Sequence, residues 1–377
     1  MRRIACALLL LALAACSKDK EVNPPAELVD FRQTLAVDRV WDASVGGGDA
    51  PLRLGLGVSA VGETIFAAGH GGVVSAFTLA DGRSLWQTKV KARLAGGTGA
   101  DAALVAVGTV SGDVIALSAA DGHVLWRVFV HGEVLSEPLV APGAVIVRTV
   151  DGRLVALARD DGKELWSVEQ QIPRLTLRGI AAPVLAGDVV VCGFDNGKVV
   201  AASLRDGSVL WESTVAPPRG RTELERLNDI DSRVWVSGDN VFAVGFQGRI
   251  AMLALDSGQV WWSHDLSSYR GFALDDEQLY VATAEGDVVA LSSRTGAEIW
   301  RQKALAWRGL SAPAVLGKHV VVADFQGYVH FLDKANGEIV ARVKSGGTRV
   351  SNPPVVAGDT LIVINDDGRV SAFRPKA

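Results

Sequence analysis

The sequence has few of the residues on which metal and covalent chemistry depend. Its 377 residues include three cysteines and six histidines. The histidines are scattered without the spacing of a metal-binding motif, and no Cys-x-x-Cys, Gly-x-Ser-x-Gly or P-loop sequence occurs. We therefore predict no catalytic residues, no metal and no cofactor.

Basic charge and helical periodicity are also lacking. The formal net charge is −4, so the sequence does not have the basic excess of a nucleic-acid-binding protein. Apolar residues make up 49% of the chain, enough for a large core, but no long stretch repeats them with a period of 3.6 residues. Helix should therefore be nearly absent.

The N-terminus reads as an export signal. Basic residues 2–3 precede an apolar run over residues 4–15, which is shorter than the ~20 residues that span a bilayer. Residues 13–16, "LAAC", resemble a bacterial lipobox, so we predict a lipoprotein signal peptide over 1–15 and lipidation of Cys16. The alternative is an ordinary signal with a chance cysteine. Ser17, in place of Asp, favours the outer membrane over the inner one.

Polar and Pro-containing residues follow, so we interpret residues 16–36 as the lipidated Cys and a flexible tether. The cysteines agree with this division. Cys6 leaves with the signal and Cys16 is acylated, so Cys192 has no partner and no internal disulfide forms. Cys192 lies in "VVVCGF", where we expect a buried strand residue.

A unit of about 40 residues recurs through the chain, as in β-propellers with one blade per repeat. Each of the eight copies has a first glycine; seven have a second glycine ten residues later and six have a tryptophan four residues further on. The first glycines are Gly72, Gly112, Gly152, Gly197, Gly248, Gly286, Gly327 and Gly368. The tryptophans are Trp86, Trp126, Trp166, Trp211, Trp262 and Trp300, and the seventh unit has Ala341 instead.

Each unit holds four strand-like segments, the later ones separated by Asp-Gly or Asn-Gly pairs that favour hairpins with positive φ at both turn residues. The eighth unit ends without a fourth strand, while "VDRVWDASV" near the start supplies Trp41. We predict an all-β domain over 37–377, an eight-bladed propeller of four-stranded antiparallel blades closed by the N-terminal strand. Trp41 and the six repeat tryptophans should pack between blades.

Two connections between consecutive blades are longer than the others. Compared with the connection after Trp126, the one after Trp166 is five residues longer and the one after Trp211 is eleven residues longer. Both insertions fall between the outer strand of one blade and the inner strand of the next. Equivalent points of consecutive repeats share one face, so the loops should lie side by side, where function concentrates.

These loops contain the candidate binding residues. The first, "EQQIPRLTLRGIAAP", offers Leu175, Leu177 and Arg178, and the second, "APPRGRTELERLNDIDSR", offers Asp229 and Asp231. One interpretation is an exposed leucine pair that docks on a partner, with Arg178 paired to one of the acids. The other is that the leucines begin a buried strand and the acids are solvated. "NDIDS" lacks the alternating ligands of a calcium loop.

The lipobox, "PPAELVDF", the eight quinoprotein-like repeats, "LTLRG" and "RLNDID" together resemble the BamB family over the whole chain. That family comprises propeller lipoproteins of the outer-membrane β-barrel assembly machinery. The resemblance implies a non-enzymatic scaffold, lipid-anchored in the outer membrane of a Gram-negative bacterium and facing the periplasm. It also implies contact with the POTRA domains of BamA through the residues matching Leu175, Leu177, Arg178, Asp229 and Asp231.

Further partners implied by the resemblance are the rest of the assembly complex and, as an open alternative, unfolded outer-membrane proteins. Two other functions stay open. The tryptophan repeat also resembles that of dehydrogenases dependent on pyrroloquinoline quinone, but those enzymes are far longer and have a calcium site and a vicinal Cys pair that this sequence lacks. A periplasmic propeller that binds a small ligand in its channel is the third reading.

Overall fold

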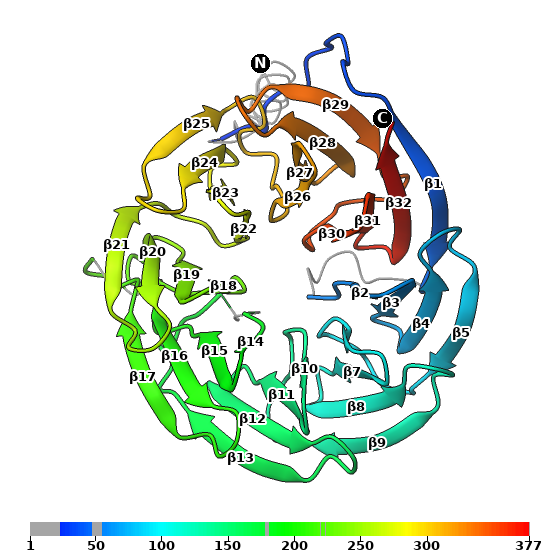
Figure 1. Cartoon of the computed structure of the whole chain (residues 1–377), viewed down its shortest axis with the longest axis vertical. Helices are drawn as coiled ribbons and strands as arrows, with labels where there is room; N and C mark the ends of the chain where they lie inside the picture. Colours follow the sequence, from blue (N-terminus) through cyan, green and yellow to red (C-terminus); the bar gives the residue numbers. More distant parts are fainter. Residues whose placement is uncertain (1–22, 47–54, 178–180, 219, 223, 377) are drawn as a thin grey trace, which may run out of the picture.

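The repeat pattern folds into a closed ring of sheets. The computed structural model describes residues 23–46, 55–177, 181–218, 220–222 and 224–376. These residues form eight four-stranded antiparallel sheets, arranged around a central axis as propeller blades (Figure 1). The predicted fold class is confirmed, and in the described part of the chain no helix could cross a membrane.

The blades follow the chain in order, each running from an inner strand at the axis to an outer strand at the rim. Blades 1–4 comprise β2 (Ser59–Val61), β3 (Thr64–Gly69), β4 (Val73–Thr78) and β5 (Ser84–Lys89); β6 (Gly99–Ala100), β7 (Leu104–Gly108), β8 (Asp113–Ser118) and β9 (Val124–Phe129); β10 (Leu139–Ala141), β11 (Ala144–Arg148), β12 (Arg153–Ala158) and β13 (Glu164–Glu169); and β14 (Val184–Ala186), β15 (Val189–Gly193), β16 (Lys198–Ser203) and β17 (Val209–Thr214). Blades 5–8 comprise β18 (Trp235–Ser237), β19 (Asn240–Val244), β20 (Arg249–Ala254) and β21 (Val260–Asp265); β22 (Phe272–Leu274), β23 (Gln278–Ala282), β24 (Val288–Ser292) and β25 (Glu298–Gln302); β26 (Ala314–Leu316), β27 (His319–Ala323), β28 (Tyr328–Asp333) and β29 (Ile339–Lys344); and β30 (Val355–Ala357), β31 (Thr360–Ile364) and β32 (Arg369–Pro375) with β1 (Val37–Ser44).

The ring closes in blade 8, where the two ends of the chain meet. β1 pairs antiparallel with β32, and Trp41 lies opposite Ala372. Trp41 is buried in a cluster that also contains residues of blade 1. The N-terminal strand thus completes the last blade and covers the edge that β32 would otherwise expose. Closure by this strand was predicted from the sequence and is confirmed.

The repeated tryptophans join neighbouring blades. The indole Nε1 of Trp166 in blade 3 donates to the carbonyl oxygen of Leu204 in blade 4 at 2.9 Å. The ring lies on Gly207, where a Cβ would come within 2.7 Å of it. The same indole-to-carbonyl bond and glycine contact are made by Trp41, Trp86, Trp126, Trp211, Trp262 and Trp300, each toward the next blade. The second glycine of the repeat therefore gives room for the tryptophan.

Ala341 is the exception because of how the ring closes. A docked tryptophan needs a glycine turn between the third and fourth strands of the next blade. Blade 8 has no such turn, because its fourth strand is β1 from the other end of the chain. Ala341 is fully buried, and Leu35 and Val37 pack against the cluster that contains it. The missing tryptophan thus follows from closure.

The turns differ from the predicted type. Gly152 and Gly162 have φ of 89° and 74°, but the aspartates before them are not among the non-glycine residues with positive φ. The prediction of positive φ at both turn residues was wrong. The loops between β11 and β12 and between β12 and β13 are longer than two residues, so only the glycine must adopt the left-handed conformation.

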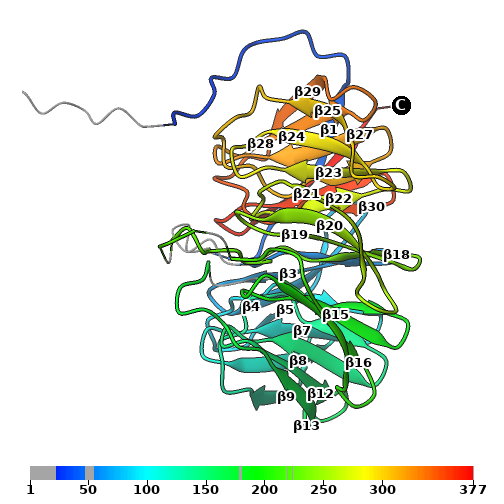
Figure 2. The ribbon, with the colours of Figure 1, turned by 90° about the vertical axis from the view of Figure 1, so that its left-hand side faces the viewer.

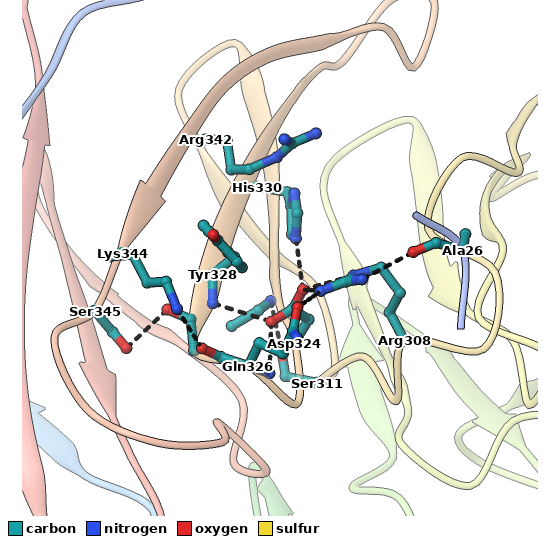
Figure 3. Close-up of polar contacts among 12 residues, drawn as sticks. Ala26, Arg308, Ser311, Asp324, Gln326, Tyr328, His330, Arg342, Lys344 and Ser345 are labelled. Atoms are coloured by element: carbon teal, nitrogen blue, oxygen red, sulfur yellow. Dashed lines mark hydrogen bonds and ion pairs between the residues drawn. The ribbon is translucent and has the colours of Figure 1, made fainter. Parts of the chain in front are cut away.

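Part of the predicted tether lies against blade 7. Ala26 donates its N–H to the Ala306 carbonyl at 2.9 Å. Its own carbonyl accepts from Arg308 Nη1 at 2.8 Å (Figure 3). Arg308 is itself buried and ion-paired with Asp324 at 2.7 Å. Further along, the guanidinium of Arg342 lies 5.0 Å from the ring centroid of Phe31.

The backbone N–H of Thr34 then donates to Val340 of β29 at 3.0 Å. The interpretation of residues 16–36 as a flexible tether therefore needs correction over 26–35, which make defined contacts. Periodicity did not reveal them, because this segment pairs with irregular connections as well as a strand. The predicted signal peptide (1–15) and Cys16 lie outside the described residues.

Closure by β1 gives a stability prediction. Trp41→Ala removes a buried indole at the closing joint, so we expect a loss of ~3–5 kcal/mol in the free energy of unfolding, typical for truncation of a large aromatic. Trp261, also on an outer strand, is 56% exposed and serves as the control. Thermal unfolding of Trp41→Ala and Trp261→Ala measures both. Equal losses of melting temperature would contradict closure through Trp41.

Candidate functional site

The two long connections form one surface. The first insertion (residues 170–183) joins β13 to β14, and the second (residues 215–234) joins β17 to β18. In the side view the second insertion, in green, projects from the left-hand face of the disc, the side on which the blue N-terminal segment also arrives (Figure 2). We call the exposed parts of the two insertions the two-loop surface.

The inner part of the second insertion is fixed to the blades. Ile230 is fully buried in the core between blades 4 and 5, and its backbone N–H donates to the Phe194 carbonyl at 3.2 Å. The carbonyl of Asp229 accepts the N–H of Phe246 at 2.9 Å. The segment that contains Asp229 and Asp231 is therefore fixed to the blades by backbone hydrogen bonds and by burial of Ile230, although it lies in a loop.

Asp229 links the two insertions. Its side chain is buried, and its Oδ2 accepts the backbone N–H of Leu177. The two insertions therefore lie side by side, as predicted, and a hydrogen bond from the Leu177 backbone to the Asp229 carboxylate joins them. Arg178, the predicted partner of the acids, lies outside the described residues, so its pairing stays a prediction.

The leucines of the first insertion are on the surface. Leu175 is 39% exposed and Leu177 is 40% exposed. The next strand, β14, begins only at Val184, so these residues do not start a buried strand. The acids show the opposite pattern, since Asp229 and Asp231 are both buried rather than solvated. The surface therefore presents apolar side chains above buried carboxylates.

Behind the leucines lies a buried charge cluster that the sequence did not reveal. Arg148 at the end of β11 is ion-paired with Asp195 at 2.6 Å, and its guanidinium lies over the Phe194 ring. Asp195, Asp229 and Asp231 each place a carboxylate oxygen within 4.8 Å of the others. An arginine inside the apolar run "AVIVRTV" was the available signal, whereas Asp195 looked like a turn former.

Among the described residues this is the one group of three acidic, His or Cys side chains close enough to share a cation. Arg148 already supplies a positive charge to it, and the acids face inward. Burial, together with the nearby charge of Asp195, raises the pKa of Asp231 to about 8 and that of Asp229 to about 6. Protonation of Asp231 at neutral pH lowers the cost of burying so many carboxylates.

Two further features adjoin this site. A cavity of about 520 Å³ surrounds the axis, with Asp231, Trp235, Tyr269 and Arg270 in its wall, so one acid of the cluster borders it. This cavity is where a channel ligand would have to bind. Cys192 is fully buried, and burial raises the pKa of its thiol to about 12, as expected for a residue that serves as a small apolar side chain.

The ring of tryptophans docked on glycine turns defines the chain as a propeller of the quinoprotein-like class. Residues 70–302 and 284–376 match the sequence model of the outer membrane protein assembly factor BamB. The BamB of Pseudomonas aeruginosa is 49% identical over 372 residues, covering 97% of each chain. That of Burkholderia pseudomallei is 39% identical, covering 99% of this chain and 97% of the relative. The chain belongs to the BamB family.

Solved structures agree with this assignment. The crystal structure of BamB from Moraxella catarrhalis superposes with a TM-score of 0.83 at 27% identity, covering 90% of this chain and all of that one. Quinohemoprotein alcohol dehydrogenase from Comamonas testosteroni reaches a TM-score of 0.72 at 12% identity, covering 90% of this chain and 76% of the enzyme. At that identity the second likeness shows a shared fold alone.

The raised pKa of Asp231 predicts a pH dependence. The folded state holds a proton that the unfolded state releases near pH 4, so the free energy of unfolding should fall as pH rises toward 8. Asp231→Asn removes this loss, and at pH 8.5 we expect it to melt at least about 2 °C above the parent, with a smaller difference at pH 5, where only part of the loss has occurred. Thermal unfolding at both values tests this.

Asp160→Asn, at an exposed position, should leave the pH dependence unchanged. A parent protein that becomes more stable between pH 5 and 8.5, with Asp231→Asn less stable at pH 8.5, would show that Asp231 is charged. In that case a cation such as Arg178 pairs with it, and the protonated cluster is refuted.

Proposed function

We propose that this chain is a non-enzymatic scaffold lipoprotein of the outer-membrane β-barrel assembly complex, and that it binds the periplasmic POTRA domains of BamA. Membership of the BamB family supports this role, since the relatives carry the name outer membrane protein assembly factor. The match extends over nearly the full length of the chain and of those relatives, so the whole scaffold is shared.

The observation that carries the proposal is an exposed leucine pair held in place by a buried carboxylate. Leu175 and Leu177 stand on the surface of a rigid disc, and Asp229 fixes the backbone of Leu177. Apolar side chains held in one conformation lose little entropy on binding, so they make effective anchors for a partner. Arg178, next to them in sequence, completes a composition common in binding hot spots.

Lipidation of Cys16 would hold the scaffold at the outer membrane on its periplasmic side. Nine residues lie between Cys16 and Ala26, whose backbone is hydrogen-bonded to Ala306 of the propeller. The N-terminal segment arrives on the side from which the second insertion projects (Figure 2). The described start of the N-terminal segment and the second insertion therefore lie on the same side of the disc, which suits a partner that is itself held in that membrane.

The enzymatic alternative has less support. The likeness to quinohemoprotein dehydrogenases extends to the fold only. The carboxylates that could hold a cation, Asp195, Asp229 and Asp231, are all buried; of the three, Asp231 borders the central cavity. Asp229 positions Leu177 and Asp195 pairs with Arg148, which are structural roles.

The proposal predicts the effect of removing the anchors. In the full-length lipidated chain, Leu175→Ala combined with Arg178→Ala should abolish co-purification of BamA from detergent-solubilised outer membranes. The melting temperature should be nearly unchanged, because Leu175 lies outside the blade cores. Asp229→Ala should weaken binding less, and should be non-additive with Arg178→Ala if the two side chains are paired.

A matched control is Leu210→Ala combined with Arg205→Ala, which removes an exposed leucine and an exposed arginine from blade 4 outside the insertions. This variant should co-purify BamA at the parental level. Normal binding by the Leu175/Arg178 variant would place the interface elsewhere. Unfolding of that variant would show that the leucine is part of the core.

A further inference from the structure

The outer part of the second insertion contains a self-capped turn. Glu225 accepts the backbone N–H groups of Arg221 at 2.7 Å and Thr222 at 3.1 Å, and the Thr222 hydroxyl accepts the N–H of Glu225 at 3.2 Å. This reciprocal pattern is a capping box, which normally starts a helix. Here it closes a single turn, completed by the N–H of Arg226 bonded to the Thr222 carbonyl at 3.1 Å. A surface segment is thereby given a fixed shape.

This turn presents Leu224 to solvent. Leu224 is 66% exposed, more than either Leu175 or Leu177. It lines a surface depression together with Gly220, Arg221, Thr222, Glu225 and Gln247. Leu227, three residues later, is buried and holds the base of the turn against the protein. A large apolar side chain on a rigid turn, left in water, has the properties of a preorganised binding anchor.

The exposed charged side chains that the structure describes around the leucines are mainly basic. Arg174 in the first insertion and Arg221 and Arg226 in the second are all exposed. Of the described acids of the same loops, Asp229 and Asp231 are buried, and Glu225 is bonded to two N–H groups, which lowers its pKa; Glu223 lies outside the described residues. In a chain of net charge −4, this surface therefore combines apolar anchors with a basic rim.

We infer that Leu224 is a third anchor of the two-loop surface and that the partner presents an apolar depression bordered by carboxylates. The inference rests on the proposed binding of BamA, whose periplasmic domains are the committed occupant. Leu224 and the two leucines of the first insertion contact the apolar part. Arg221 and Arg226 face the acidic border, where complementary charge mainly accelerates association.

The test uses the full-length lipidated chain in detergent and purified BamA from the source organism. Leu224→Ala should raise the dissociation constant by at least about tenfold, as for a truncated hot-spot side chain. Arg226→Glu should lower the association rate, and added salt should reduce that difference. Leu165→Ala, a 52% exposed leucine on β13, is the matched control and should bind like the parent.

The outcomes separate this inference from the proposed function. If Leu175→Ala weakens binding while Leu224→Ala and Arg226→Glu do not, the second insertion is no anchor and the inference fails alone. If none of these variants weakens binding, the interface lies elsewhere and the inference fails while BamA binding stands. If the parent itself does not bind BamA, the proposed function fails. Thr222→Val, which keeps Leu224 but removes the capping hydroxyl, should weaken binding less than Leu224→Ala. A loss as large as that of Leu224→Ala, with an unchanged melting temperature, would assign the contact to Thr222.

Discussion

The contact of each tryptophan with the glycine turn of the next blade is the interaction on which the rest of the molecule depends. The indole fills the space left by the absent Cβ and donates to a carbonyl of the same turn, as Trp166 does on Gly207. Seven of the eight junctions between blades are thereby joined at the rim, far from the axis, and between blades 7 and 8 Ala341 takes the place of the tryptophan. The last tie, from Trp41 to Gly82, crosses the point where the chain ends meet and makes the ring continuous.

A continuous ring gives loops a fixed base, and the two insertions use it. Buried charged groups lie beneath the two insertions. Arg148 of blade 3 is ion-paired with Asp195 of blade 4, and Asp229 of the second insertion accepts the backbone N–H of Leu177 in the first. Burying several carboxylates together is costly, and the raised pKa of Asp231 expresses that cost. The result is that Leu175, Leu177 and Leu224 stay exposed in defined positions rather than collapsing onto the protein.

The periodic features could be predicted from the sequence, and the contacts between distant residues could not. Glycine and tryptophan spacing gave eight blades, and loop length located the two insertions, because both depend on position within the repeat. The burial of Asp229 and its bond to Leu177 depend on how residues from two blades meet, which no local pattern records. The bond from Arg308 to Ala26 could not be predicted for the same reason. Nor could the reason for the alanine at position 341, which is that the fourth strand of blade 8 comes from the N-terminus. Leu224 was not predicted as a binding residue, although the capping-box pattern Thr-x-x-Glu at residues 222–225 is present in the sequence.

The central claim is that the rigid face built from the two insertions, and not the rim of the propeller, contacts BamA. Site-specific photo-crosslinking in living cells tests this most directly, with the photoreactive residue placed singly at Leu175, Leu224, Leu165 and Leu210. All four side chains are exposed, so reactivity toward solvent is matched. We expect crosslinks to BamA from positions 175 and 224 and none from 165 or 210. Crosslinks to BamA from the two rim positions alone would contradict it.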